Sequence, residues 1–331
     1  MKKKVKLNHD VVTFALVVLL YAVVAFLLYS GSLTRQIANM LIPISVYIVL
    51  AVSLNLVVGL LGELSLGHGG FLSVGLFSGC LVAIALSATP LPLFVRLPLS
   101  MIVGGLVAMV FGFIVGLPAL RLKGDYLAIV TLACGEIIKN IITNLDITGG
   151  ALGLNTGAIY SNAKTLLPYA AVLVLLTVLV MMNLKRSKHG RAIMAIRDSR
   201  IAAESVGINI TKYKMMAFVT SAFLAGMAGA LFGLNYSTVT ASKFKFDTSI
   251  LVLVFVVLGG IGNIRGSVIA AALLTVLPEL LRAFADYRML VYAVVLIAVM
   301  LATNSPALRS ALSRVIPHRR HANVKKEGES A

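Results

Sequence analysis

Long hydrophobic runs, separated by short polar segments, occupy most of the chain. Most of them are about 20 residues long with few or no charges, which is the length that a helix needs to cross about 30 Å of hydrocarbon. Backbone amides in lipid must pair within their own segment, so the pattern predicts an all-α polytopic membrane protein. We predict a bundle of ten spans, at residues 11–29, 36–60, 64–88, 95–119, 125–143, 165–184, 214–236, 248–260, 267–284 and 288–303.

The stretch from 248 to 284 could form one long helix or two short ones. A single helix would place Asn263 and Arg265 deep in the bilayer, where an arginine costs about 2.5–3.5 kcal/mol on insertion scales. Glycine is a poor helix residue, and four glycines crowd the same place, at positions 259, 260, 262 and 266. We therefore predict a break within "GGIGNIRGS".

Positive charge supports the even number of spans. Cytoplasmic loops carry an excess of Lys and Arg, and ten spans place most of the 29 Lys and Arg on the side of the N-terminus. Nine spans would export the basic tail. The prediction is a cytoplasmic N-terminus at 1–10, a transmembrane domain at 11–303 with a cytoplasmic loop at 185–214, and a basic cytoplasmic tail at 304–331. The first run is too long for the apolar core of a signal peptide and lacks an A-x-A site, so we expect it to be retained.

Composition and missing motifs exclude several classes of protein. The chain is 59% hydrophobic and 12% charged, and no soluble domain of this size could bury so much apolar surface. Its basic residues are spread over separate loops, so the net charge of +17 indicates topology and attraction to membrane lipid rather than nucleic-acid binding. There is no Walker A loop, H-E-x-x-H or G-x-S-x-G, and both cysteines lie in apolar runs without metal-ligand spacing. We expect no enzyme activity, and no metal or cofactor bound by this chain.

The stretch "SLNLVVGLLGELSLGHGGFLSVGLFSG", residues 53–79, is rich in glycine and interspersed with polar side chains. Glycine suits a broken helix or a tight crossing, and unwound backbone at membrane depth is tolerated where it is buried in protein or lines a watery cavity. A short cytoplasmic hairpin between two packed spans explains the pattern equally well. The candidate path residues here are Asn55, Glu63, Ser65, His68 and Gly69.

A second stretch, residues 124–154, places Glu136, Lys139 and Asn140 on one helix face, at i, i+3 and i+4. Ionisable residues within a span usually turn inward and find partners. We favour a structural Glu136–Lys139 pair, and the alternative is that Glu136 and Asn140, with Tyr126, face a substrate route. The segment "TGGALGLNTG" reads as an external loop that is polar enough to meet a soluble partner.

The third stretch, residues 185–214, has eight basic and two acidic residues and a local net charge of +6. Its apolar residues fit two short helices better than one amphipathic helix. Asp198 or Ser199 can cap the second helix, and Gly207 can end it in the left-handed conformation. The second helix would present a small apolar face of Ala202, Ala203 and Val206, flanked by Arg200 and Glu204. We interpret this loop as a docking element for a groove on another protein, the alternative being an ordinary positive-inside loop.

Four separated motifs resemble those of branched-chain amino acid ABC transporter permeases, in the same order. They are "SLNLVVGLLGELSLGHGGF", "GDYLAIVTLACGEI" with "TGGALGL", "HGRAIMAIRDSRIAAESVGINITKYKMMAFVTSAFLAGMAGALFG" and "VLGGIGNIRGSVIAA", within roughly residues 40–303. The "GDYLAIVTLACGEI" stretch is more similar to the second, M-type permease of these transporters. The resemblance implies a bacterial inner-membrane importer for leucine, isoleucine or valine. It implies four partners: a second permease, two cytoplasmic ATPases that bind the ATP, and an external binding protein.

Carried onto this sequence, the resemblance assigns contact with the ATPases to Arg191, Ile196, Arg197, Asp198, Ala202, Ala203, Glu204 and Gly207. One departure concerns the substrate. After "GHGGF" the family often continues with a Gly-Ala-Tyr triplet, whereas this chain has Gly75, Leu76 and Phe77. A related permease for urea or short-chain amides is therefore an alternative. An ion-coupled secondary transporter, which would use Glu63 or Glu136, and a passive pore are further alternatives.

Overall fold

The computed structural model describes residues 9–281 except 33 and 123, together with residues 290, 291, 293, 294, 296 and 297. In this part of the chain, six helices are long and apolar enough to cross a membrane, and Phe14–Tyr29 is a shorter apolar helix. The six candidate spans are Gln36–Leu61, His68–Ser87, Leu93–Ala119, Asp125–Asn144, Ala163–Arg186 and Ile210–Leu234. The prediction of an all-α, multi-pass membrane protein is confirmed at this level.

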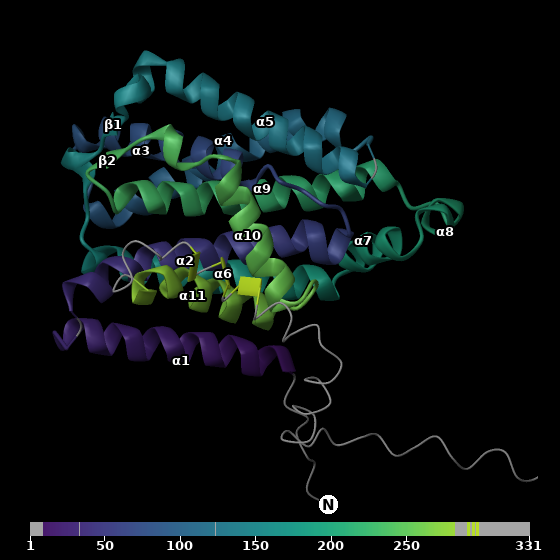
Figure 1. Cartoon of the computed structure of the whole chain (residues 1–331), viewed down its shortest axis with the longest axis horizontal. Coiled ribbons are helices and arrows are strands. Elements are labelled where there is room, and N and C mark those ends of the chain that lie inside the picture. Colours follow the sequence, from purple (N-terminus) through teal and green to yellow (C-terminus); the bar gives the residue numbers. More distant parts are fainter. Residues whose placement is uncertain are drawn as a thin grey trace, which may run out of the picture. The chain divides into compact units, whose positions relative to one another are not determined.

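The elements follow one another in the order drawn in Figure 1. The longer helices are α1 (His9–Tyr29), α2 (Arg35–Asn55), α3 (His68–Ser87), α4 (Leu93–Ala119), α5 (Asp125–Asn144), α6 (Ala163–Arg186), α9 (Ile210–Leu234), α10 (Phe246–Gly259) and α11 (Ile264–Leu280). The short ones are a π-helix η1 (Leu56–Leu61), α7 (Lys188–Asp198), α8 (Arg200–Ser205) and the 3₁₀ turns η2 (Asp146–Thr148), η3 (Gly150–Leu152), η4 (Gly157–Ile159) and η5 (Ala241–Lys243).

Strands β1 (Leu154–Asn155) and β2 (Thr238–Val239) pair antiparallel, with Leu154 opposite Val239. We call the end of the helices that carries this pair the sheet end, and the opposite end, beyond which α7 and α8 project, the loop end (Figure 1). Contacts divide the chain into two units, Met1–Val276 and Leu277–Ala331. The contacts described below lie within the first unit.

Helices α3, α4 and α9 form a tightly packed core because glycines let their backbones approach. A methyl group on Gly226 of α9 would lie 2.8 Å from the carbonyl oxygen of Gly104 in α4. A methyl group on Gly79 of α3 would lie 3.1 Å from the carbonyl oxygen of Ser100, also in α4. Small residues at helix interfaces are typical of membrane bundles, where close van der Waals packing replaces the hydrophobic effect.

Two interruptions divide the helical architecture. The first follows α2, which continues as η1 and ends at Gly62, a residue with φ of 78°. Backbone without helical structure then extends to Gly67, and α3 begins at His68, so the predicted span 64–88 began too early. The second interruption, at residues 260–263, separates α10 from α11 and confirms the predicted break within "GGIGNIRGS".

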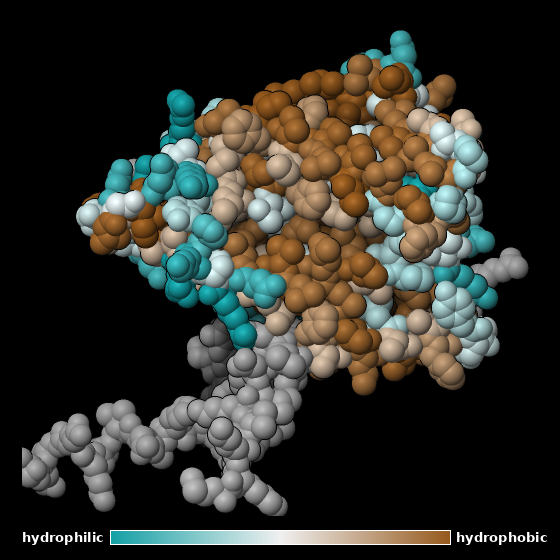
Figure 2. Space-filling model, turned by 180° about the vertical axis from the view of Figure 1, so that it is seen from behind, coloured by the Kyte–Doolittle hydropathy of each residue, from teal (hydrophilic) through white to brown (hydrophobic). Residues whose placement is uncertain are grey.

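The number of spans and the position of the termini stay predictions. Helix α10 has only 14 residues, which is short for a complete crossing. Only six scattered residues of the predicted tenth span, 288–303, are described, and the N-terminal residues 1–8 and the tail 304–331 lie outside the described part. Figure 2 shows a broad hydrophobic band between hydrophilic ends, as expected for a surface that faces lipid between two aqueous phases.

Candidate functional site

The loop between α6 and α9 forms a helical hairpin, α7 and α8, with well-defined helix caps. The Ser187 hydroxyl accepts a hydrogen bond from the Gly190 amide at 3.0 Å at the start of α7. At the start of α8, the Ser199 hydroxyl accepts one from the Ala202 amide at 3.3 Å. Of the two predicted caps, the structure therefore selects Ser199 rather than Asp198. Gly207, the second residue after α8, has φ of 81°, as the sequence predicts.

The apolar tip of this hairpin differs from the predicted one. Ile201 is 83% exposed and Val206 75% exposed, whereas Ala203 is only 3% exposed. The sequence interpretation placed Ala203 on the contact face, whereas the structure buries this side chain within the first unit of the chain. Ile196 is buried in the same way. The remaining residues assigned to this contact are exposed on the hairpin: Arg191, Arg197, Asp198, Ala202, Glu204 and Gly207.

A buried ion pair anchors the unwound segment 62–67 at the loop end. Lys214, near the start of α9, donates to the Glu63 carboxylate, and both side chains are largely buried. Each charge compensates the other where solvation by water is poor. The sequence marked Glu63 as a path residue but did not identify Lys214, which lies 151 positions away, as its partner.

From this anchor, the unwound segment runs into the middle of the bundle. The Leu66 amide donates to Thr131 Oγ1 of α5 at 3.0 Å, and His68 Nε2 lies 2.8 Å from Ser221 Oγ of α9. Ser221 lies eleven residues into α9, roughly 16 Å along the helix. A short hairpin at the membrane surface, one of the two sequence interpretations, does not describe this geometry. The segment is exposed at Gly62 and reaches full burial at Ser65 and Gly67, so its inner part is unwound backbone enclosed by protein, the arrangement that membranes tolerate.

The start of α3 meets the start of α10 at this depth. The Gly69 amide donates to Ser249 Oγ at 2.9 Å, and a methyl group on Gly69 would lie at the same distance from that oxygen. Ser65, three residues before α3, is also buried, and its Oγ has no hydrogen-bond partner among the described residues. Two helix N-termini, each with a positive dipole end, thus converge within the bundle.

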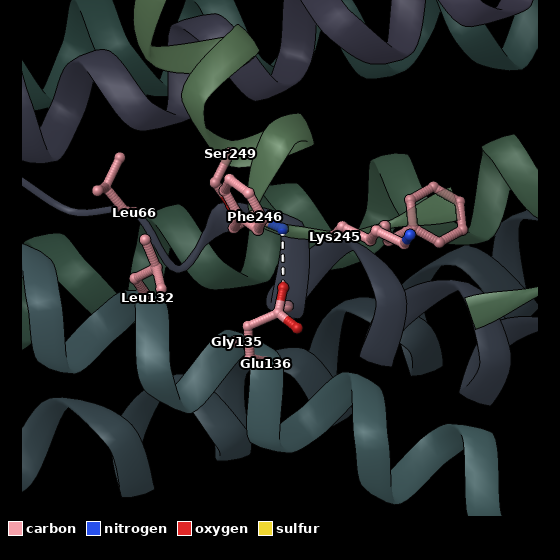
Figure 3. A pocket seen from close by; sticks show the side chains of 9 residues that line it. Leu66, Leu132, Gly135, Glu136, Lys245, Phe246 and Ser249 are labelled. Carbon is pink, nitrogen blue, oxygen red and sulfur yellow. Dashed lines mark hydrogen bonds between the residues drawn. The ribbon is translucent and has the colours of Figure 1, made fainter. Parts of the chain in front are cut away.

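A small, shallow hollow lies between α5, the unwound segment and the start of α10 (Figure 3). Glu136 of α5 is its acidic group. One carboxylate oxygen accepts from the Phe246 amide at 2.9 Å, the dashed line in Figure 3, and the other pairs with Lys139. The rest of the lining is mostly apolar or glycine: Leu66, Gly70, Leu132, Gly135, Phe244, Phe246, together with Lys245 and Ser249.

The structure confirms the Glu136–Lys139 pair and also gives Glu136 a second contact, across to α10. Several of the other candidate path residues do not line the hollow. Tyr126 is 72% exposed and Asn140 is exposed, both away from the hollow. Asn55 is fully buried at the other interruption, where Oδ1 accepts from the Gly262 amide at 2.8 Å. Among the described residues, no three acidic, His or Cys side chains gather as metal ligands.

Sequence reasoning missed two contributors to this region. Ser249 and the start of α10 were read only as part of an apolar span, although they complete the hollow. Phe244 and Lys245 lie between the predicted spans 214–236 and 248–260 and were not identified as contributors. The signal that could have found them is the pair of short segments interrupted by glycine, because discontinuous helices often place their N-termini at a substrate site.

Comparisons with known proteins give the family. The model of the branched-chain amino acid transport system permease component matches residues 36–301. LivM, the high-affinity branched-chain amino acid transport system permease protein of Salmonella typhimurium, is 37% identical over 287 residues, and that of Escherichia coli is 36% identical. The LivH permease of Escherichia coli is 24% identical over 275 residues, covering 78% of this chain and 89% of LivH.

Both LivM alignments cover 77% of this chain and 66% of the relative, so the chain spans just under two thirds of the length of these proteins. No solved structure matches the chain. The family match covers most of the chain, including the loop hairpin, both interruptions and the hollow. The chain therefore belongs to the family of branched-chain amino acid transport permease components, and within it is more similar to LivM than to LivH.

Proposed function

We propose that this chain is the M-type permease subunit of an ATP-driven importer in a bacterial inner membrane, which moves leucine, isoleucine or valine delivered by an external binding protein. The observation that carries the proposal is the capped α7–α8 hairpin at the loop end, within a chain of this family. An ordinary positive-inside loop needs neither side-chain caps nor a folded tip.

The hairpin fits a cytoplasmic ATPase as its partner. Ile201 and Val206 expose apolar surface at the tip, and the charged Arg200 and Glu204 flank it. A small apolar contact with a charged rim is the usual composition of a protein interface. Closure of the ATPases on ATP binding would push on this tip and bias the bundle between two states.

The hollow at Glu136 fits part of a path for apolar amino acids. Leu66, Leu132 and Phe246 supply apolar surface, whereas Glu136 can accept hydrogen bonds from an ammonium group. In this structure Glu136 is engaged by Lys139 and by the Phe246 amide. Passage of a substrate therefore requires α5 and α10 to separate.

The outward face of α5 supports a second permease subunit as a neighbour. This helix has the lowest hydropathy of the six candidate spans, 1.5, and is the least buried of them. Tyr126 and Asn140 lie on its exposed side. Polar side chains within a span rarely face lipid, so we expect a protein surface here.

The sheet end offers a surface for the binding protein. The segment "TGGALGLNTG" forms a compact succession of 3₁₀ turns and strand β1, rather than an open loop. Leu152 is 89% exposed on it. An apolar side chain among polar and glycine residues suits transient contact with a soluble protein.

Uptake by reconstituted vesicles tests the proposal. We expect the chain to co-purify with a second permease and two ATPases, and radiolabelled leucine uptake to require ATP and the binding protein. Uptake should survive collapse of the proton gradient, and the chain alone should conduct neither leucine nor urea. Uptake that follows an ion gradient without ATPases would contradict the proposal, and ATP-driven uptake of urea or amides in place of leucine would correct the substrate.

A further inference from the structure

The π-helix η1 lies between the α7–α8 hairpin and the break that separates α10 from α11. All six of its residues, Leu56–Leu61, are buried. A π-helix is rare, and single turns of this kind occur most often at functional sites. Its contacts on both sides are specific, and they connect two parts of the chain that the sequence keeps far apart.

On the side of the hairpin, Arg197 holds η1. Its Nη1 donates to the Gly59 carbonyl oxygen at 3.0 Å, across 138 positions of sequence. Carbonyl groups near the end of a helix lack helical donors, so an arginine is a suitable partner for them. Asp198 accepts from Arg197 Nε at 3.0 Å and from Nη2 at 2.9 Å, which orients the guanidinium.

The arginine stem also packs against the end of η1. A methyl group on Gly62 would lie 2.5 Å from Arg197 Cγ, so the stem fits only because residue 62 has no side chain. The guanidinium contact and this packing contact together attach the last residue but one of α7 to η1 at two points.

On the other side, Asn55 and Gly59 hold the break. Asn55 Oδ1 accepts from the Gly262 amide at 2.8 Å, and Asn55 Nδ2 donates to Ser267 Oγ of α11 at 2.9 Å. The amide of this fully buried side chain thus contacts both the break and α11. A methyl group on Gly59 would lie 2.5 Å from the Gly262 nitrogen, so η1 and the break are in direct contact.

Helix α10 connects this break to the hollow. It starts at Phe246, whose amide binds Glu136, and ends at Gly259 beside the break. Its 14 residues give a length of roughly 21 Å. A displacement of the break therefore moves the helix that covers one side of the hollow.

We propose that η1 transmits movement of the α7–α8 hairpin to α10, and that Arg197 is the positioning residue that attaches the hairpin to η1. The inference rests on the proposed function, because it assumes that a partner drives the hairpin. Although Arg197 is partly exposed, its Nη1 reaches the Gly59 carbonyl oxygen, so we assign it attachment within this chain rather than contact with the ATPase. The hairpin, η1 and the break then move as one body, and α10 opens or closes the hollow.

A reversible disulfide tests the attachment. A side chain added at residue 62 would place Cβ 3.4 Å from Arg197 Cβ, close to the Cβ separation of about 3.5–4.5 Å in disulfides. The variant is G62C/R197C, in a background where Cys80 and Cys134 are replaced by alanine. It loses the arginine when reduced and regains a covalent attachment when oxidised. The measurement is leucine taken up per ATP hydrolysed by the complete transporter in proteoliposomes.

We expect this ratio to fall at least about fivefold in the reduced variant, the lower range of allosteric coupling, and to recover on oxidation. The single variants G62C and R197C should not respond to oxidation. R197Q, which keeps residue 62 as glycine, should show the same low ratio, which covers the case in which the double variant fails to fold. An equal ratio in the parent, R197Q and reduced protein would overturn the inference. So would uptake that is lost on oxidation, because the contact would then have to open during transport.

These outcomes separate the inference from the proposed function. If the parent protein shows no ATP-dependent uptake, the proposed function fails. If the parent transports and R197Q loses thermal stability while its ratio stays unchanged, Arg197 is only a helix cap and the inference alone fails.

Discussion

Buried polar residues depend for their roles on partners that the sequence does not reveal. Glu63 and Asn55 both stood out in the sequence as polar groups in an apolar run. Their partners, Lys214 and Gly262, lie 151 and 207 positions away, and no local pattern connects them. The Glu136–Lys139 pair was predictable because a spacing of three residues places both side chains on one helix face.

Replacing Lys214 with methionine should destabilise the protein by about 3 kcal/mol, because it leaves the Glu63 carboxylate buried without its counter-charge. Thermal unfolding in detergent measures the effect. The double variant E63Q/K214M should recover much of the loss, since no unpaired charge remains. Equal stability of K214M and the parent would show that water reaches the pair.

Glu136→Gln tests the residue at the hollow. A glutamine can still accept the hydrogen bond from the Phe246 amide, so we expect the protein to assemble. It loses the charge that pairs with Lys139 and that would meet an ammonium group, so leucine uptake should fall by at least about tenfold, the equivalent of 1.4 kcal/mol. Co-purification of partners provides the control, and unchanged uptake would remove Glu136 from the path.

Among the helices, the sequence predicts long spans well and interruptions only in part. The predicted 36–60, 95–119 and 125–143 agree with Gln36–Leu61, Leu93–Ala119 and Asp125–Asn144 within a few residues, because apolar length determines them. The start of α3 was predicted four residues too early. Hydropathy alone cannot distinguish buried unwound backbone from helix, since both consist of apolar and glycine residues.

Gly226→Ala tests the close packing of α9 on α4. The added methyl group would lie 2.8 Å from the Gly104 carbonyl oxygen, so α4 must shift, at a cost of about 1–3 kcal/mol. Gly135→Ala is the matched control, because its methyl group would have no neighbour closer than 3.8 Å. We expect a lower melting temperature for G226A than for G135A. The reverse order would contradict the packing described for this core.

For the molecule as a whole, the two ends should serve different partners. Ile201→Asp at the loop end should remove the ATPases from the purified complex, because a charge replaces exposed apolar contact surface. Leu152→Asp at the sheet end is the matched variant, since it places the same charge at an equally exposed position. It should keep the ATPases and lose stimulation by the binding protein. Identical behaviour of the two variants would contradict the assignment of the ends.

Ten spans with a cytoplasmic N-terminus also predict that the C-terminus is cytoplasmic. A fluorescent protein fused after Ala331 should fold and fluoresce in the cytoplasm, whereas a periplasmic phosphatase fused at the same place should be inactive. The opposite pattern would give an odd number of spans. Charge distribution carries this prediction, because it acts during insertion and depends on no tertiary contact.

The antiparallel pairing of β1 with β2 has a consequence for stiffness. Leu154 precedes α6 and Val239 follows α9. The pairing of β1 with β2 therefore links the connection before α6 to the connection after α9, and the two cannot fluctuate separately. The Thr156 amide adds another hydrogen bond between the two connections, to the Ser237 carbonyl oxygen at 2.9 Å. A soluble protein that binds at the sheet end therefore meets a rigid surface, and large movements of the backbone are confined to the loop end.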